Sequence, residues 1–285
     1  MSVKIIQERL DRYLCASTLE EENAIKEISQ EIALLSLSRA GFFKVAAFQG
    51  GTCLRVLFSL DRFSEDLDFA LMESNPNFQW KPYLEKVVLE FAFYGYELKV
   101  QDRSEAQDPV KKAFLKDHSI GKVLSLKHRN RSGRQQQIQI RLEIDTHPPL
   151  RANYELKYLD FPLPYAITVH DLPTLFAGKS HALLTRPYTK GRDWYDFLWY
   201  TARKTKVNYL FLFHALEQHG PWKGKKFNVD KEWYLREMES KIKSIDWKDT
   251  KADVSRFLKA RELQPLEFWS EKFFLERLTK MKEYL

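Results

Sequence analysis

The segment from 45 to 71 constrains the fold more than any other part of the sequence. It comprises a short apolar strand, the pair Gly50-Gly51, a short amphipathic helix, a polar loop and a second apolar strand that carries Asp66 and Asp68. Glycine lets a bulky anion approach backbone N–H groups, and the first turn of a helix offers unpaired N–H donors to it. Side chains two apart on a strand share a face, about 6 to 7 Å apart. This order predicts a site for phosphate beside divalent metal.

Each of these features also has an ordinary structural explanation. An Asp-x-Asp pair can be the solvent face of an amphipathic strand, and Gly-Gly is a common turn signal. Their succession within one short stretch favours a functional site instead. Two carboxylates on one face suit Mg²⁺ or Mn²⁺, since hard cations prefer oxygen ligands and keep substrate phosphates in their shell. We therefore predict Asp66 and Asp68 as metal ligands.

A lysine within an apolar helical stripe indicates a second functional segment. Apolar residues at 172, 175, 176 and 183 follow helical spacing around Lys179. One interpretation is a lysine whose stem covers apolar surface while its amine reaches water. The other is an ammonium directed at a triphosphate.

Two acids follow on the next expected helix. Asp193 and Asp196 are three residues apart among aromatic residues, so they share a face, and Asp196 is the better candidate for a functional group. It could accept a proton from an attacking hydroxyl or hold the lysine in place, whereas Asp193 could simply suit the helix dipole. Arg186, Lys190 and Arg192 precede or begin this helix and would bind phosphate or an RNA backbone, or form an ordinary solvated loop.

A third acidic position is offered by the expected strand at 138–145. Glu143 and Asp145 fall on one face of it. Asp145 is the candidate for a third metal ligand. An acid at a strand end is also a common turn residue.

These motifs resemble a known family. Gly50-Gly51-Thr52 and the run from Arg62 to Phe69 are similar to the signature of the AbiEii/AbiGii-type nucleotidyltransferase toxins, a branch of the polymerase-beta-like nucleotidyltransferase superfamily. The segments 175–186 and 190–197 resemble the family's second block. The resemblance implies phosphate, triphosphate, metal and site-completing roles for Gly51, Thr52, Ser64, Asp66, Asp68, Lys179 and Asp196. Gly50 and Arg192 are further candidates for contacts with the nucleotide.

The resemblance also implies an activity. A nucleotidyl group would pass from a nucleoside triphosphate to an acceptor with release of pyrophosphate, and the 3′ end of tRNA is the favoured acceptor. The protein would be the toxin of a toxin–antitoxin or phage-defence (abortive infection) pair, with a cognate antitoxin protein as partner. The alternatives are a protein acceptor, a small-molecule acceptor such as an antibiotic, and a non-catalytic RNA-binding protein.

Composition limits the setting. The net charge of +7 and the pI near 9.1 favour a polyanionic partner. Two cysteines without CxxC spacing form no disulfide framework. No apolar run reaches the length of a membrane span and the N-terminus lacks a secretory signal, so we expect a cytoplasmic protein with no membrane association.

Periodicity predicts an α/β (α+β) architecture. Residues 1–170 are expected to form a nucleotidyltransferase domain with N-terminal helices over 1–40, a mixed sheet and a hairpin near 130–133. Residues 171–285 read as an all-helical domain that contributes Lys179 and Asp196, with helices at 172–185, 209–218 and 231–243 among others. The active site is expected between these two parts.

Overall fold

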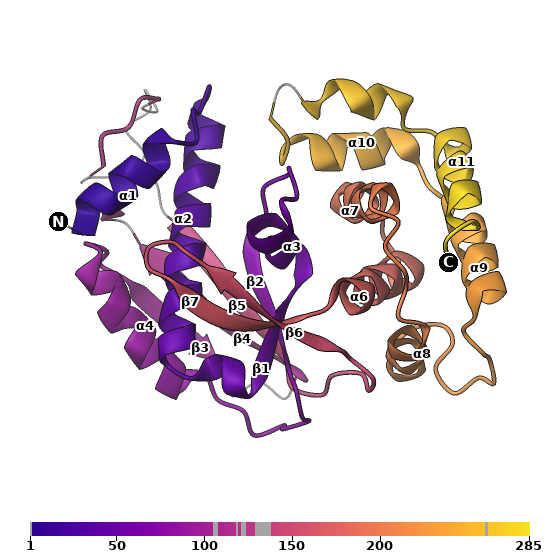
Figure 1. The fold of residues 1–285 in the computed structure, drawn as a ribbon, viewed down its shortest axis with the longest axis horizontal. Helices are drawn as coiled ribbons and strands as arrows, with labels where there is room; N and C mark the ends of the chain where they lie inside the picture. The colour runs from indigo at the N-terminus through magenta and orange to yellow at the C-terminus, as the bar shows by residue number, and fades with distance from the viewer. Residues whose placement is uncertain (1, 105–107, 118, 121–123, 129–137, 260–261) are drawn as a thin grey trace. The chain divides into compact units, whose positions relative to one another are not determined.

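The computed structural model describes residues 2–104, 108–117, 119–120, 124–128, 138–259 and 262–285. The chain forms two compact units. The first comprises residues 1–59, 63–148 and 156–169, and the second comprises 60–62, 149–155 and 170–285. The first unit contains the N-terminal helices and most of a mixed sheet, and the second contains the C-terminal helices (Figure 1).

The first part of the chain alternates helices and strands. Its elements are α1 (Ser2–Asp11), α2 (Thr18–Arg39), η1 (Phe42–Lys44), β1 (Ala46–Gln49), α3 (Gly50–Phe58), β2 (Asp66–Leu71), α4 (Lys81–Phe93), β3 (Lys99–Arg103), β4 (Val110–Asp117), β5 (Ile138–Asp145), β6 (Tyr154–Leu159) and β7 (Tyr165–His170).

The strands form one seven-stranded sheet in the order β3-β4-β5-β2-β1-β7-β6. β2 pairs antiparallel with β1 and parallel with β5, while β4 pairs antiparallel with both β3 and β5. The sheet is therefore mixed, which confirms the predicted fold class. The turn expected near 130–133 lies outside the described residues.

Helix α2 organises the core on one side of this sheet. It contacts α1, α4 and β5, and its residues from Ala24 to Leu37 are almost all buried. The N-terminal helices expected over 1–40 are α1 and α2, and the second begins where the Ser17 side chain accepts a hydrogen bond from the Glu20 N–H at 3.2 Å. α1, α2 and α4 gather on the same side of the sheet (Figure 1).

A buried ionic network joins α1, α2 and α3. Arg9 donates to both Glu31 carboxylate oxygens at 2.9 and 3.1 Å. The Tyr13 hydroxyl donates to Glu27 at 2.8 Å, and Arg55 Nε donates to the other Glu27 oxygen at 2.7 Å. Each carboxylate therefore enters the interior with a hydrogen-bonded partner, as burial of a charge requires.

The second unit is built from helices. They are α6 (Leu172–Thr185), α7 (Gly191–Ala202), α8 (Tyr209–Gln218), α9 (Lys231–Lys243), α10 (Trp247–Ser255), η3 (Gln264–Phe268) and α11 (Glu271–Met281). Aromatic rings fill its interior: Trp247 stacks on Phe274 with centroids 4.1 Å apart, and Trp194 meets Phe274 edge-on at 5.3 Å. Among the described residues, no helix combines the length and apolar character that crossing a bilayer demands.

His170 is a buried titratable residue at the end of β7. Its ring is 1% exposed, packs against Tyr154 and Phe211, and leaves Nε2 without a hydrogen-bond partner among the described residues. Burial lowers the pKa of His170 from 6.5 to about 4. The folded protein thus holds this histidine neutral.

We expect acid to destabilise the fold through this residue. Because the unfolded chain binds the His170 proton more tightly, the stabilisation is fully present above about pH 6.5 and is lost as the pH falls toward 4, by about 3 kcal/mol in total. Urea unfolding from pH 4 to 8 should show a smaller acid loss for His170→Phe than for wild type. If the free energy of unfolding fell equally with acid in the variant and the wild type, His170 would not be the group responsible for the acid loss.

Candidate active site

Strand β2 holds the predicted acidic pair. Asp66 and Asp68 are half-buried on one face of the strand, while Leu67 and Phe69 are buried on the other. β2 lies between β1 and β5, so both carboxylates sit within the sheet and not at its edge. The alternation read from the sequence predicts this arrangement correctly.

Gly50 packs directly against Asp68. Its φ is +79°, in the left-handed region, and a Cβ placed on it would lie 2.3 Å from Asp68 Oδ2. Helix α3 begins at this residue, and the Gln49 side chain that precedes it makes no capping hydrogen bond. Only glycine satisfies both the backbone conformation and the close approach of the carboxylate. Gly51 follows in the first turn.

Thr52 and Ser64 lie near the Asp66–Asp68 pair in sequence but make different hydrogen bonds. Thr52 is fully buried, and its Oγ1 donates to the Asp66 carbonyl at 2.5 Å, which fixes α3 to the start of β2. Ser64 lies in the loop before β2, and its carbonyl accepts from Gln30 Nε2 at 3.1 Å. No hydrogen bond to the Ser64 hydroxyl occurs within the part of the chain that the structure describes.

Arg141 is a cation of this site that the sequence analysis missed. It is the register neighbour of Asp66 on β5, and its Nη2 lies 2.5 Å from Asp66 Oδ2 while Nη1 lies 3.3 Å from Glu143. The hydrogen bond that Arg141 donates to Asp66 raises the Arg141 pKa, so this side chain stays charged. An arginine alternating with acids on a strand was the available signal, but the pairing of β5 with β2 was needed to interpret it.

Glu143 of β5 is the register neighbour of Asp68 on β2. Asp145, the candidate third ligand, pairs with Ala70 one step further along, and its Oδ1 accepts the His147 N–H at 2.9 Å. No group of three or more His, Cys, Asp or Glu suited to a metal ion occurs among the described residues. Asp66 and Asp68 share one face of β2, and Glu143 is their acidic neighbour on β5.

The second unit holds a buried charge cluster, which we define as Arg62, Lys179, Arg186, Asp193 and Asp196. Lys179 Nζ lies 2.6 Å from Asp193 Oδ1 and 2.8 Å from Asp196 Oδ2. Arg62 donates from Nε and Nη2 to both Asp196 oxygens at 2.7 Å, and Arg186 pairs with Asp193. Asp193 and Asp196 project from α7 and Lys179 from α6, as their spacing predicts.

Most side chains of this cluster are buried, so each charge needs an oppositely charged partner. The Arg62 and Asp196 side chains are 3% and 0% exposed. Burial opposes the charge on Lys179, but Asp193 and Asp196 outweigh it and raise the Lys179 pKa. Burial likewise opposes ionisation of Asp193, yet Lys179 and Arg186 lower its pKa. Asp196, with both oxygens held by cations, is arranged to position Lys179 and Arg62.

Arg62 is the second residue that the sequence analysis left without a role, although it stands in the quoted motif. Arg192, a predicted phosphate contact, lies over the Phe257 ring at 4.1 Å. Asp66 and Asp68 belong to the first unit, whereas Lys179 and Asp196 belong to the second.

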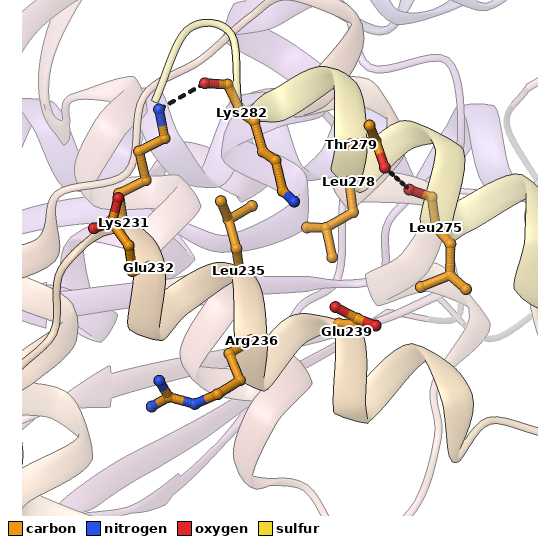
Figure 2. A pocket seen from close by; sticks show the side chains of 9 residues that line it. All are labelled: Lys231, Glu232, Leu235, Arg236, Glu239, Leu275, Leu278, Thr279 and Lys282. Atoms are coloured by element: carbon orange, nitrogen blue, oxygen red, sulfur yellow. Dashed lines mark hydrogen bonds between the residues drawn. The ribbon is translucent and has the colours of Figure 1, made fainter.

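One groove of about 690 Å³ lies apart from these residues. It is bordered by α9 and α11, with Leu235, Leu275 and Leu278 in its lining. Figure 2 shows Lys231 Nζ closing one end through a 2.6 Å hydrogen bond to the Lys282 carbonyl. It contains none of the predicted site residues.

The mixed sheet, the acidic pair and the glycine turn agree with the predicted class of protein, and the comparison with family models identifies the family. The model of the AbiEii nucleotidyl transferase toxins of type IV toxin–antitoxin systems matches residues 32–276. The chain belongs to this family and is a nucleotidyltransferase toxin.

The chain is similar to solved structures at low sequence identity. JHP933 from Helicobacter pylori is 15% identical with a TM-score of 0.50, over 90% of this chain and 90% of that chain. MenT4, a nucleotidyltransferase toxin from Mycobacterium tuberculosis, is 16% identical with a TM-score of 0.49, over 99% of each chain. The comparison with curated proteins found no match.

Gly50→Ala should distort the acidic pair. The variant places a Cβ in the Asp68 carboxylate and forces alanine to a positive φ, which costs at least about 1–2 kcal/mol. Urea unfolding should show this loss. Gly178→Ala is the matched control: a Cβ there meets only Phe211 at 3.9 Å within a helix, so the same substitution should gain about 0.5–1 kcal/mol. Equal effects at both positions would contradict the argument.

Separating Arg62 from Asp196 should destabilise the second unit. Arg62→Ala removes the guanidinium that binds both Asp196 oxygens, and Asp196→Ala leaves the buried Arg62 without this carboxylate. Each should cost about 3–5 kcal/mol, and the double variant should lose less than the sum. Chemical denaturation of the three variants measures this coupling. Lys243→Ala, which breaks the exposed pair with Glu239, should leave the unfolding curve nearly unchanged. Strict additivity at Arg62 and Asp196 would refute the pairing.

Proposed function

We propose that this toxin transfers a nucleotidyl group from a nucleoside triphosphate to the 3′ end of tRNA and depends on Mg²⁺ or Mn²⁺. The observation that carries the proposal is the packing of Gly50 against Asp68, which keeps two carboxylates at the first turn of α3. Anion-binding N–H groups and metal-binding oxygens thus adjoin each other within one unit. Membership in the nucleotidyltransferase toxin family supports this assignment.

Asp66 and Asp68 would hold the metal ion, and the donor set fits it. Both are hard oxygen ligands on one sheet face, and the Arg141 guanidinium that pairs with Asp66 would have to share this carboxylate with the metal ion. The bound ion would neutralise charge on the triphosphate and orient it. Asp145 remains the candidate third ligand. Gly50, Gly51 and Thr52 would meet the phosphates through backbone N–H groups, and Ser64 through its hydroxyl.

Lys179 would add a fixed cation to the triphosphate, held in place by Asp193 and Asp196. Arg62, the partner of Asp196, stands in the same sequence motif as Asp66 and Asp68, which supports its participation. In this arrangement Asp196 acts as a positioning residue and not as a proton acceptor. Arg192 is proposed as an additional phosphate contact.

The net charge of +7 supports a polyanionic acceptor such as tRNA. Type IV toxin–antitoxin systems pair a toxin with an antitoxin, and we propose that a cognate antitoxin protein restrains this chain, in a phage-defence (abortive infection) role within the cytoplasm.

Transfer of radiolabel tests the proposal. The protein is incubated with each of the four labelled nucleotides, Mg²⁺ and total RNA, and the products are resolved by size. We expect label on tRNA, with its loss in Asp66→Asn, in Asp68→Asn and after chelation of the metal. Glu85→Gln, which removes one exposed carboxylate on α4, is the control and should retain activity.

The outcomes separate the parts of the proposal. Label on another RNA or on a protein would reject tRNA as the acceptor. Label that persists in both aspartate variants would reject the metal mechanism.

A further inference from the structure

The sheet face that carries the acidic pair continues across two more strands to an edge. Register places Arg141 of β5 beside Asp66, Phe114 of β4 beside Arg141, and Gln101 of β3 beside Phe114. Paired residues share a sheet face, so these four side chains form one row. With adjacent strands about 4.8 Å apart, the Phe114 strand lies about 10 Å from that of Asp66.

A second row runs parallel to the first. It leads from Asp68 through Glu143 and Lys112 to Arg103. Lys112 is 38% exposed and lies 3.9 Å from Glu143. The acidic pair is therefore connected to the sheet edge by a row that ends in two cations.

Cations dominate this face on β3 and β4. We define the basic sheet face as Lys99, Arg103, Lys112, Phe114 and Lys116. Lys99 pairs with Lys116 in register, which adds two more positive charges on the same side.

The acids of these two strands lie on the opposite face. Asp102 pairs with the buried Ala113, and Asp117 is buried and accepts the N–H groups of Ser119 and Ile120. The charges are thus sorted by face: within β3 and β4, whose residues are all described, the open side carries four cations and no carboxylate.

An aromatic ring lies among these cations. Phe114 is half-buried in a row of otherwise polar side chains, and the Arg103 guanidinium sits 5.0 Å from its ring centroid. The neighbouring residues of β4, Ala113 and Leu115, already fill the core on the other face. A phenylalanine on the open face is therefore not required to complete the core.

This combination fits a single-stranded polynucleotide. Cations along a surface bind the phosphate backbone, and an aromatic ring among them stacks with a base of any identity. An acidic peptide would use the charges but not the ring. Continuity with Asp66 and Asp68 places the bound strand's end near the reacting groups.

We propose that the basic sheet face binds the unpaired 3′-terminal nucleotides of the RNA acceptor, with a base on Phe114 and phosphates on Lys112, Lys116 and Arg103. This inference rests on the proposed function, since it assigns the acceptor subsite of the same reaction.

Binding without chemistry tests it. A short fluorescein-labelled oligoribonucleotide of mixed sequence is titrated with the full-length protein by anisotropy, without nucleotide or divalent metal. Phe114→Ala should raise Kd about tenfold, and Phe114→Trp should retain affinity. The binding constant K falls as the salt concentration rises. Lys112→Ala and Lys116→Ala should each make the slope of log K against log salt less negative by about 0.7.

A matched control distinguishes this face from net charge. Lys81→Ala combined with Lys86→Ala removes two exposed cations from α4, outside the basic sheet face, and should leave the salt slope unchanged. Equal losses in this control, or wild-type affinity in the Phe114 and lysine variants, would overturn the inference. If a protein partner used this face instead, the Phe114 and lysine variants would bind the oligoribonucleotide with wild-type affinity.

Transfer kinetics separate this inference from the proposed function. The basic-face variants should raise KM for RNA while KM for the nucleotide stays constant, and Asp66→Asn should bind the oligoribonucleotide but not extend it. If wild type labels no RNA while the variants still weaken binding, the proposed function fails and the RNA-binding face stands. If wild type labels RNA and the variants change neither Kd nor KM, the face alone is rejected.

Discussion

The pairing of β1 with β2 is the constraint on which the rest of the site depends. It sets Gln49 level with Asp68, so the next residue, Gly50, must turn the chain directly beside that carboxylate. The same turn starts α3, whose Thr52 hydroxyl holds the Asp66 carbonyl. One strand pairing thus fixes the acidic pair and the glycine turn to each other. A rigid arrangement of this kind suits chemistry that depends on positioning and electrostatics more than on covalent steps.

The buried charge cluster serves a different need. Four of the five charged side chains, all but Arg186, lie largely out of water, and their desolvation costs energy that mutual attraction rarely exceeds, so a well-packed apolar set could be as stable. Stability of the fold alone therefore does not explain why this cluster is charged. It does keep Lys179 and Arg62 charged and fixed in rotamer by acids on α7. A preorganised cation loses no reorganisation energy when it meets a phosphate.

Local patterns were sufficient for part of this structure. The helices at 172–185, 209–218 and 231–243 match α6, α8 and α9, because each has a cap and an apolar stripe that specify its ends. The period of two in β2 was sufficient to align Asp66 with Asp68. Such signals are contained within one element and need no knowledge of its neighbours.

The missed features depend on partners distant in sequence. Arg141 becomes a site residue only because β5 pairs with β2, 75 positions away, and Arg62 only because it meets Asp196, 134 positions away. Strand β4 was also missed, since its lysines obscure the apolar alternation of Ala113 and Leu115. Register and ion pairing across such separations are tertiary properties that periodicity does not encode.

The ionic network in the first unit connects the N-terminal segment to the helix that begins at the glycine turn. Arg55 projects from α3, the nine-residue helix that starts at Gly50, and its partner Glu27 also receives the Tyr13 hydroxyl. Withdrawing α1 together with Tyr13, which follows it, would remove one hydrogen-bond donor from the buried Glu27 and leave Arg55 as its ion-pair partner. Two consecutive hydrogen bonds, through Glu27, therefore connect the segment after α1 to the helix that begins at the glycine turn.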